Sequence, residues 1–84
     1  QLGCAQYLMH RTGHNIGHRC HGIGANLDDY ETHDDRCLLP GTMFSIEPGL
    51  YTDKYGVRLE YDVHITSEGE TKVYGPVQDE ILVI

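Results

Sequence analysis

One run of alternating residues does most to limit what this chain can fold into. Residues 57–66 read VRLEYDVHIT, in which apolar and polar positions alternate. Successive side chains of a β-strand point to opposite faces, so the run predicts a strand with one apolar and one polar face. The apolar face would carry Val57, Leu59, Tyr61, Val63 and Ile65, and the polar face Arg58, Glu60, Asp62 and His64. Taken alone, the run is typical of a half-exposed strand.

The other segments also favour strands and turns over helices. Gly13 and Gly17 interrupt residues 10–24, and each would cost about 1 kcal/mol inside a helix, so an irregular extended segment fits better. Residues 43–51 read as a strand broken at Pro48, and shorter strands are expected at 71–74 and 80–84. A helix end is expected only within residues 1–9. The fold class predicted is α+β, with a β-rich, curved antiparallel sheet and little helix.

Composition excludes several classes of partner. The 84 residues suffice for one small domain. A net charge of −7 with no basic stripe argues against nucleic acid and anionic membranes. No apolar run approaches the roughly 20 residues that span a bilayer. The 3 cysteines are odd in number and form no CxxC pair, which favours a reducing compartment and a cytoplasmic location over a disulfide framework.

Four histidines, His10, His14, His18 and His21, fall within one glycine-rich stretch. If the stretch is extended, the first three share a face. Neutral imidazole is a common ligand of borderline transition metals. Because the histidines are interleaved with Gly, Ile and Thr, a purification tag is a poor explanation, whereas a surface patch explains the cluster as well as a metal site does.

Two glutamates could complete a metal site. Glu47 ends an apolar strand on the face opposite Phe44 and Ile46, and the following proline restricts it to an extended geometry. Glu60 lies on the polar face of the alternating run. A lone glutamate at either position is usually just solvated. Together with His14, however, they form a nitrogen and oxygen ligand set that suits Mn, Co, Fe or Zn, and two carboxylates could bridge a metal pair.

Three runs resemble the M24 "pita-bread" metallopeptidases, in the family's order and spacing. HRTGHNIG at 10–17 with His21 resembles the H-x-x-G-H-x-x-G…H signature, and LPGTMFSIEPGLY at 39–51 and GVRLEYDV at 56–63 resemble its two ligand-bearing strands. The residues of the last two runs resemble those of Xaa-Pro aminopeptidases and prolidases more closely than those of methionine aminopeptidases. Creatinase-like relatives share the fold without metals.

The resemblance implies a role for each matching residue. His14, Glu47 and Glu60 match metal ligands, with Glu60 bridging two divalent ions (Mn, Co or Zn) and Glu47 also moving the proton of the attacking water. His10 and His21 match histidines near the scissile bond, and Arg58 matches an arginine near the metals. The reaction implied is hydrolysis of a peptide or dipeptide before proline, with proline at P1'.

The family's site also uses two aspartates upstream of the first histidine motif, and residues 1–9 contain none. We therefore expect residues 1–84 to be the C-terminal part of an M24 catalytic domain, inactive alone. Its sheet should leave an apolar face uncovered, so we expect a homo-oligomer or association with the N-terminal half. The alternative is a truncated, non-catalytic module that acts in self-association or partner binding.

Overall fold

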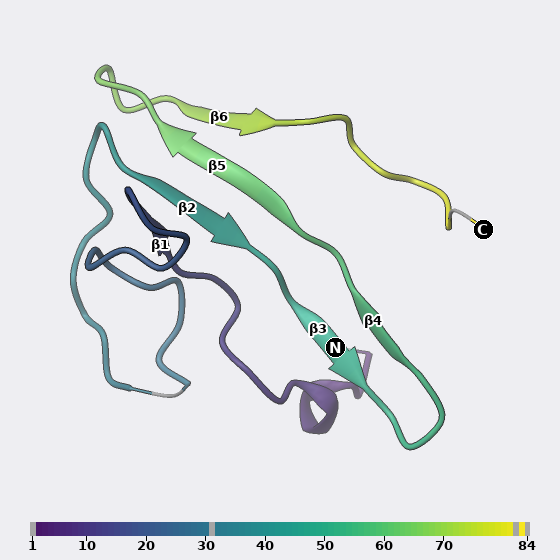
Figure 1. The fold of residues 1–84 in the computed structure, drawn as a ribbon. Helices are drawn as coiled ribbons and strands as arrows, with labels where there is room; N and C mark the ends of the chain where they lie inside the picture. The colour runs from purple at the N-terminus through teal and green to yellow at the C-terminus, as the bar shows by residue number, and fades with distance from the viewer. Residues whose placement is uncertain (1, 31, 82, 84) are drawn as a thin grey trace.

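The computed structural model describes residues 2–30, 32–81 and 83. Within these residues the elements are a 3-10 helix and six strands: η1 (Ala5–Tyr7), β1 (Asn15–Ile16), β2 (Met43–Ile46), β3 (Gly49–Tyr51), β4 (Gly56–Arg58), β5 (Tyr61–Ile65) and β6 (Thr71–Tyr74). All pairings are antiparallel, in a four-stranded sheet of order β1-β2-β5-β6 and a two-stranded sheet β3-β4 (Figure 1). The predicted β-rich class with little helix is confirmed.

The two sheets are successive parts of one long hairpin. Ser45 pairs with Asp62 in β2-β5, and Gly49 pairs with Arg58 in β3-β4. Both pairs belong to the same register, because moving four residues forward from Ser45 and four back from Asp62 gives Gly49 and Arg58. Halfway between these pairs, Glu47 lies opposite Glu60. The sequence predicted one unbroken strand over residues 57–66, and this was wrong: the strand is interrupted at residues 59 and 60. The facing Pro48 has no N–H to donate to the ladder, which explains the interruption.

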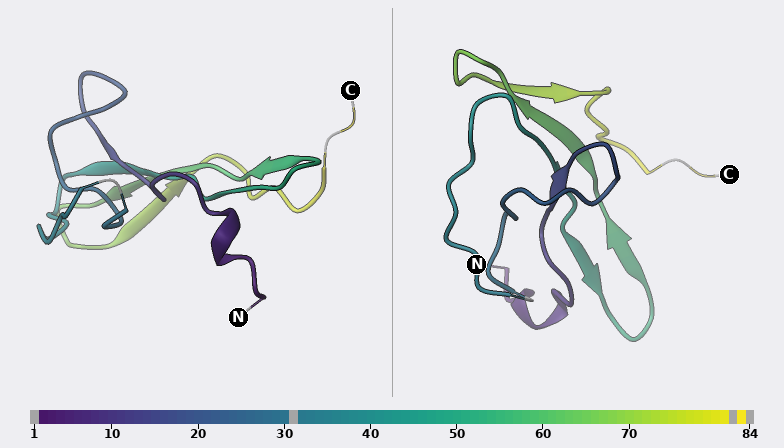
Figure 2. Two further views of the ribbon diagram at one scale, coloured as in Figure 1. Left: turned by 90° about the horizontal axis from the view of Figure 1, so that it is seen from below. Right: turned by 60° about the vertical axis from the view of Figure 1, so that its left-hand side comes forward.

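The buried core is small and lies at the centre of the sheet. Phe44 and Val63 face each other across β2 and β5, and they are 5% and 1% exposed. Such directly opposed pairs are the units that stabilise a sheet. Further along the hairpin, Val57 and Leu59 are 55% and 41% exposed. Figure 2 shows the strands edge-on as a thin layer, with η1 leaving it on one side. The apolar face is therefore covered only near its centre.

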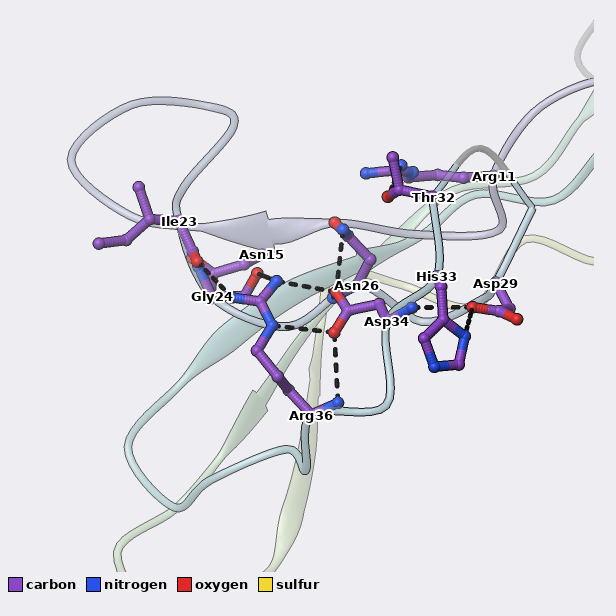
Figure 3. A network of polar contacts seen from close by, with 10 residues as sticks. All are labelled: Arg11, Asn15, Ile23, Gly24, Asn26, Asp29, Thr32, His33, Asp34 and Arg36. Carbon is purple, nitrogen blue, oxygen red and sulfur yellow. Dashed lines mark hydrogen bonds and ion pairs between the residues drawn. The ribbon is translucent and has the colours of Figure 1, made fainter.

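An ion pair holds the long connection between β1 and β2. Arg36 donates from Nε and Nη2 to the two carboxylate oxygens of Asp34, both at 2.8 Å (Figure 3). Nη1 donates to the Ile23 carbonyl at 2.9 Å, and Nη2 also donates to the Gly24 carbonyl at 3.0 Å. The Arg36 hydrogen bonds and the Asn26 backbone N–H hold the pKa of Asp34 well below its usual range. The connection is thus fixed by polar contacts rather than by an apolar core.

The C-terminal segment departs from the expected pattern. A strand was expected at 80–84, but residues 80, 81 and 83 are not in a strand. Leu82 and Ile84 lie outside the described residues. Among the residues that the structure describes, no helix is long and apolar enough to cross a membrane.

Candidate metal centre

The register of the hairpin gathers polar residues on one face. Ser45 and Glu47 alternate along β2 and its extension, opposite Asp62 and Glu60 respectively, and Arg58 follows opposite Gly49. Residues that face each other across an antiparallel pair, and those two positions further along, share a face of the sheet. The carboxylates of Glu47 and Glu60 therefore converge, as the sequence parity requires.

The two carboxyl groups lie close together. The side-chain contact with Glu47 raises the pKa of Glu60, desolvation and the negative charges of Glu47 and Asp62 raise it further, and Arg58 opposes the shift. Two carboxylates this close repel each other when both are ionised, which disfavours the charged form of Glu60. A divalent cation between them would remove that repulsion. The pair therefore fits the metal-bridging role that its residue types suggest.

Contacts with β2 fix the position of His14. Its side chain is buried, with the residue 7% exposed. The Ser45 N–H donates to the His14 carbonyl at 2.9 Å, and the His14 N–H donates to the Ser45 hydroxyl at 3.1 Å. The ring Nδ1 lies 3.0 Å from the Asn15 carbonyl, which can only accept, so Nδ1 carries the proton. Nε2 of the neutral ring is then left with its lone pair, as metal-binding histidines require.

Gly13 allows the histidine segment to lie close against Ser45 of β2. A Cβ at this position would lie 2.0 Å from the Ser45 carbonyl oxygen and 2.7 Å from a methyl carbon of Leu27. The backbone N–H groups of Thr12 and Gly13 donate to the Asp28 carboxylate, which fixes the segment from the other side. Asp28 is therefore engaged in holding the backbone, as expected for a loop acid that is not a ligand.

A hollow of about 310 Å³ lies over these groups. Its lining residues are His10, Arg11, His14, His21, Glu47 and Arg58. The rings of His14 and His21 approach to 4.3 Å between centroids. His18 does not line this hollow. The shared face of His10, His14 and His18 was expected only for an extended stretch, and this condition is not met, because β1 ends at Ile16 and the chain bends at Gly17.

Tyr51 joins the site through a network that sequence reasoning missed. Its hydroxyl accepts from Arg58 Nη2 and Nε at 2.8 and 3.2 Å. His10 Nδ1 donates to the Arg11 carbonyl at 2.7 Å, so Nε2 accepts from the Tyr51 hydroxyl at 2.8 Å. Strand alternation could have revealed this residue. Tyr51 lies two residues after Gly49 and four after Glu47, so its side chain points to the same face as that of Glu47.

Gly49 leaves the space that the network occupies. A Cβ here would lie 2.6 Å from the Tyr51 hydroxyl and 2.8 Å from His10 Nε2. Because Gly49 has no side chain, the side chains of Tyr51 and His10 can lie over the hairpin at this position, next to Glu47.

Cys20 is a second residue that sequence reasoning missed. It lies near His14 and His21, and one ligand atom from each of the three lies within 4.8 Å of the others. The interpretation of the sequence favoured nitrogen and oxygen ligands over thiolates, so no cysteine was considered.

The hairpin sets Glu47 opposite Glu60, and Glu47 and the His14 imidazole line one hollow, so residue types that bind divalent metals lie on one side of the sheet. The comparison with known families agrees with the geometry. Residues 1–67 match metallopeptidase family M24, and the chain belongs to this family.

The chain is similar to dipeptidases and prolidases of this family. It is 39% identical over 75 residues to the Mycobacterium tuberculosis protein named "Probable dipeptidase PepE", covering 87% of the chain and 19% of that relative. The Xaa-Pro dipeptidase from Bacillus anthracis superposes with a TM-score of 0.73 at 34% identity, covering 98% of this chain and 22% of that one. For the prolidase from Pyrococcus horikoshii the TM-score is 0.72 at 33% identity, with 84% and 19% covered. The chain thus spans about a fifth of the length of these relatives.

Proposed function

We propose that this chain is the C-terminal, ligand-bearing part of an M24 peptidase that hydrolyses the bond before proline in dipeptides or short peptides. The observation that carries the proposal is the register of the hairpin, which sets Glu47 opposite Glu60. In support, Glu47 lines one hollow with His14, whose Nε2 is available. These three residues would hold two divalent ions, Mn, Co or Zn. When bound, the ions would supply an activated water and polarise the scissile carbonyl.

The remaining residues of the hollow bind substrate and move protons. Glu47 is positioned to accept a proton from the attacking water and to return it to the leaving amine. His10 and His21 line the same hollow and contact the peptide around the scissile bond. Arg58 supplies a positive charge that the Tyr51 hydroxyl orients, which suits the carboxylate of a dipeptide or the developing oxyanion.

The proposal includes a partner for the uncovered sheet. Val57, Leu59 and Ile81 are 55%, 41% and 87% exposed, and they lie along one hollow of about 630 Å³. Contiguous apolar surface of this kind usually marks an interface. The occupant proposed is the N-terminal half of the catalytic domain, which would supply the two upstream aspartates, or a second copy of the chain. The described cysteines are free thiols, which fits a cytoplasmic location.

Hydrolysis of dipeptides by the whole protein that carries this chain tests the proposal. With Mn²⁺ added, an Xaa-Pro dipeptide should be cleaved and its Xaa-Ala counterpart much more slowly. Glu60→Gln should lower kcat/KM by more than about 100-fold, because even second-shell losses cost 10–100-fold. Glu70→Gln is the matched control, since Glu70 lies beyond β5 in an exposed turn. Equal activity of the two variants would refute the ligand role of Glu60.

A further inference from the structure

The loop after β1 places a thiol next to two imidazoles. His14, Cys20 and His21 each offer one ligand atom, and these atoms lie within 4.8 Å of one another. His14 is buried, whereas Cys20 and His21 are exposed on the loop. The proposed peptidase mechanism uses both histidines but gives Cys20 no task. Cys20 thus adds a thiol, a different type of metal ligand, at the edge of the candidate metal centre.

Backbone contacts hold this loop in a closed form. The Gly17 N–H donates to the Arg19 carbonyl at 3.0 Å, and the Gly22 N–H donates to the Asn15 carbonyl at 2.8 Å. The loop from Gly17 to Gly22 therefore returns to the residue that follows His14. This closure brings Cys20 and His21 back towards His14.

Asn15 fixes the closure to the sheet. Its amide Nδ2 donates to the Met43 carbonyl at 3.1 Å, and its Oδ1 accepts from the Gly24 N–H at 3.1 Å. A Cβ on Gly22 would lie 2.1 Å from this Oδ1, so a larger residue there would displace the Asn15 side chain from these contacts. The loop is therefore preorganised, and ordering it on cation binding requires little further loss of conformational freedom.

We propose that His14, Cys20 and His21 form a site for a thiophilic divalent cation, of which Zn²⁺ is the physiological representative. Zinc takes two imidazoles and one thiolate tetrahedrally, at about 2.0–2.1 Å for nitrogen and 2.3 Å for sulfur, with water in the fourth position. The separation of up to 4.8 Å is wider than tetrahedral ligands allow, and rotation of the exposed Cys20 and His21 side chains closes it. The thiol releases its proton to solvent as the sulfur–metal bond forms.

The site competes with the catalytic pair for His14. Hard cations such as Mn²⁺ prefer the carboxylates of Glu47 and Glu60, whereas the thiolate selects softer ions. A zinc ion on Cys20 and His21 takes the Nε2 that the proposed reaction needs. The site is therefore inhibitory, and this consequence rests on the proposed peptidase function, whereas cation binding at the three residues does not.

Cobalt as a probe tests the binding step without substrate. A thiolate bound to Co²⁺ gives a sulfur-to-metal charge-transfer absorption that imidazole and carboxylate ligands do not produce. The whole protein carrying this chain should show this band on titration with Co²⁺. Cys20→Ser should abolish it, and Cys37→Ser, which removes another exposed free thiol, should leave it unchanged. A wild-type protein that binds Co²⁺ without the band, or a band that persists in Cys20→Ser, overturns the site.

Zinc inhibition of the Mn²⁺-loaded enzyme tests the competition. Cys20→Ser should retain the basal rate and require about tenfold more Zn²⁺, or higher, for half-inhibition, because one of three ligands is gone. Unchanged zinc sensitivity in Cys20→Ser overturns the inhibitory role. If no variant hydrolyses Xaa-Pro dipeptides, the proposed function fails, and the cobalt band alone decides whether the cation site exists.

Discussion

Replacement of Gly13 by alanine should separate the need for space at this position from any need for unusual backbone geometry. Gly13 is not among the glycines with positive φ, so alanine can adopt its backbone conformation. The added Cβ would, however, lie 2.0 Å from the Ser45 carbonyl oxygen. Carbon and oxygen normally approach to about 3.3 Å. The histidine segment and β2 must therefore move apart by about 1.3 Å.

The free-energy cost follows from the contacts that such a movement breaks. Three hydrogen bonds join the segment to β2, at 2.9, 2.6 and 3.1 Å: Ser45 N–H to the His14 carbonyl, Glu47 N–H to the Thr12 carbonyl, and His14 N–H to the Ser45 hydroxyl. At about 0.5–1.5 kcal/mol each, their loss should lower the free energy of unfolding by about 2–4 kcal/mol. His14 also shifts away from the carboxylate pair, so metal affinity should fall with stability.

Gly17→Ala is the matched control four residues further along the same segment. Its Cβ would find no atom nearer than the Gly22 Cα at 3.8 Å. A compatible Gly→Ala change alters stability by about 0.4–1 kcal/mol, in the stabilising direction. Urea unfolding of the whole protein gives the global values, and hydrogen exchange at the Ser45 and Glu47 amides reports the local loss. Equal stability and equal exchange in the two variants would refute the close-approach argument.

Two further changes test the network and the ion pair. Tyr51→Phe keeps the ring but removes the hydroxyl that links Arg58 to His10, so kcat/KM for Xaa-Pro dipeptides should fall by about tenfold or more with little change in melting temperature; unchanged kinetics would exclude a positioning role. Asp34→Asn should lower the melting temperature at pH 7, because Arg36 lowers the folded-state pKa of Asp34. That stabilisation is complete above the unfolded pKa of about 4 and declines as pH falls towards the lowered folded pKa, so the two melting curves should converge in acid. A difference independent of pH would contradict this account.

Much of the candidate site could be predicted because strand parity is a local property. Alternation over residues 57–66 assigned Glu60 to a polar face, and the position of Glu47 opposite Phe44 and Ile46 did the same for the other strand. Parity does not say which residue of one strand faces which residue of its partner. The observed pairing of Ser45 with Asp62 supplies that missing information.

The features that sequence reasoning missed depend on bends and close approaches. The histidine segment looks uniformly extended, yet it leaves the sheet after Ile16, so His18 does not line the hollow and Cys20 lies near His14 and His21. Tyr51 enters because Gly49 leaves room for its hydroxyl beside His10. None of these contacts follows from residue spacing alone, since each requires knowing where a loop closes.

The turn at the end of the hairpin explains how so small a chain can specify the carboxylate pair. The Thr52 hydroxyl donates to the Tyr55 carbonyl at 3.0 Å and accepts from the backbone N–H groups of Lys54 and Tyr55 at 3.2 and 3.1 Å. This turn sets Tyr51 opposite Gly56, and the same register continues to the site. A slip of one residue would place the two glutamates on different faces. The pairing breaks beside Pro48, where Glu47 lies opposite Glu60, so the local chemistry of the turn determines which of these residues face each other.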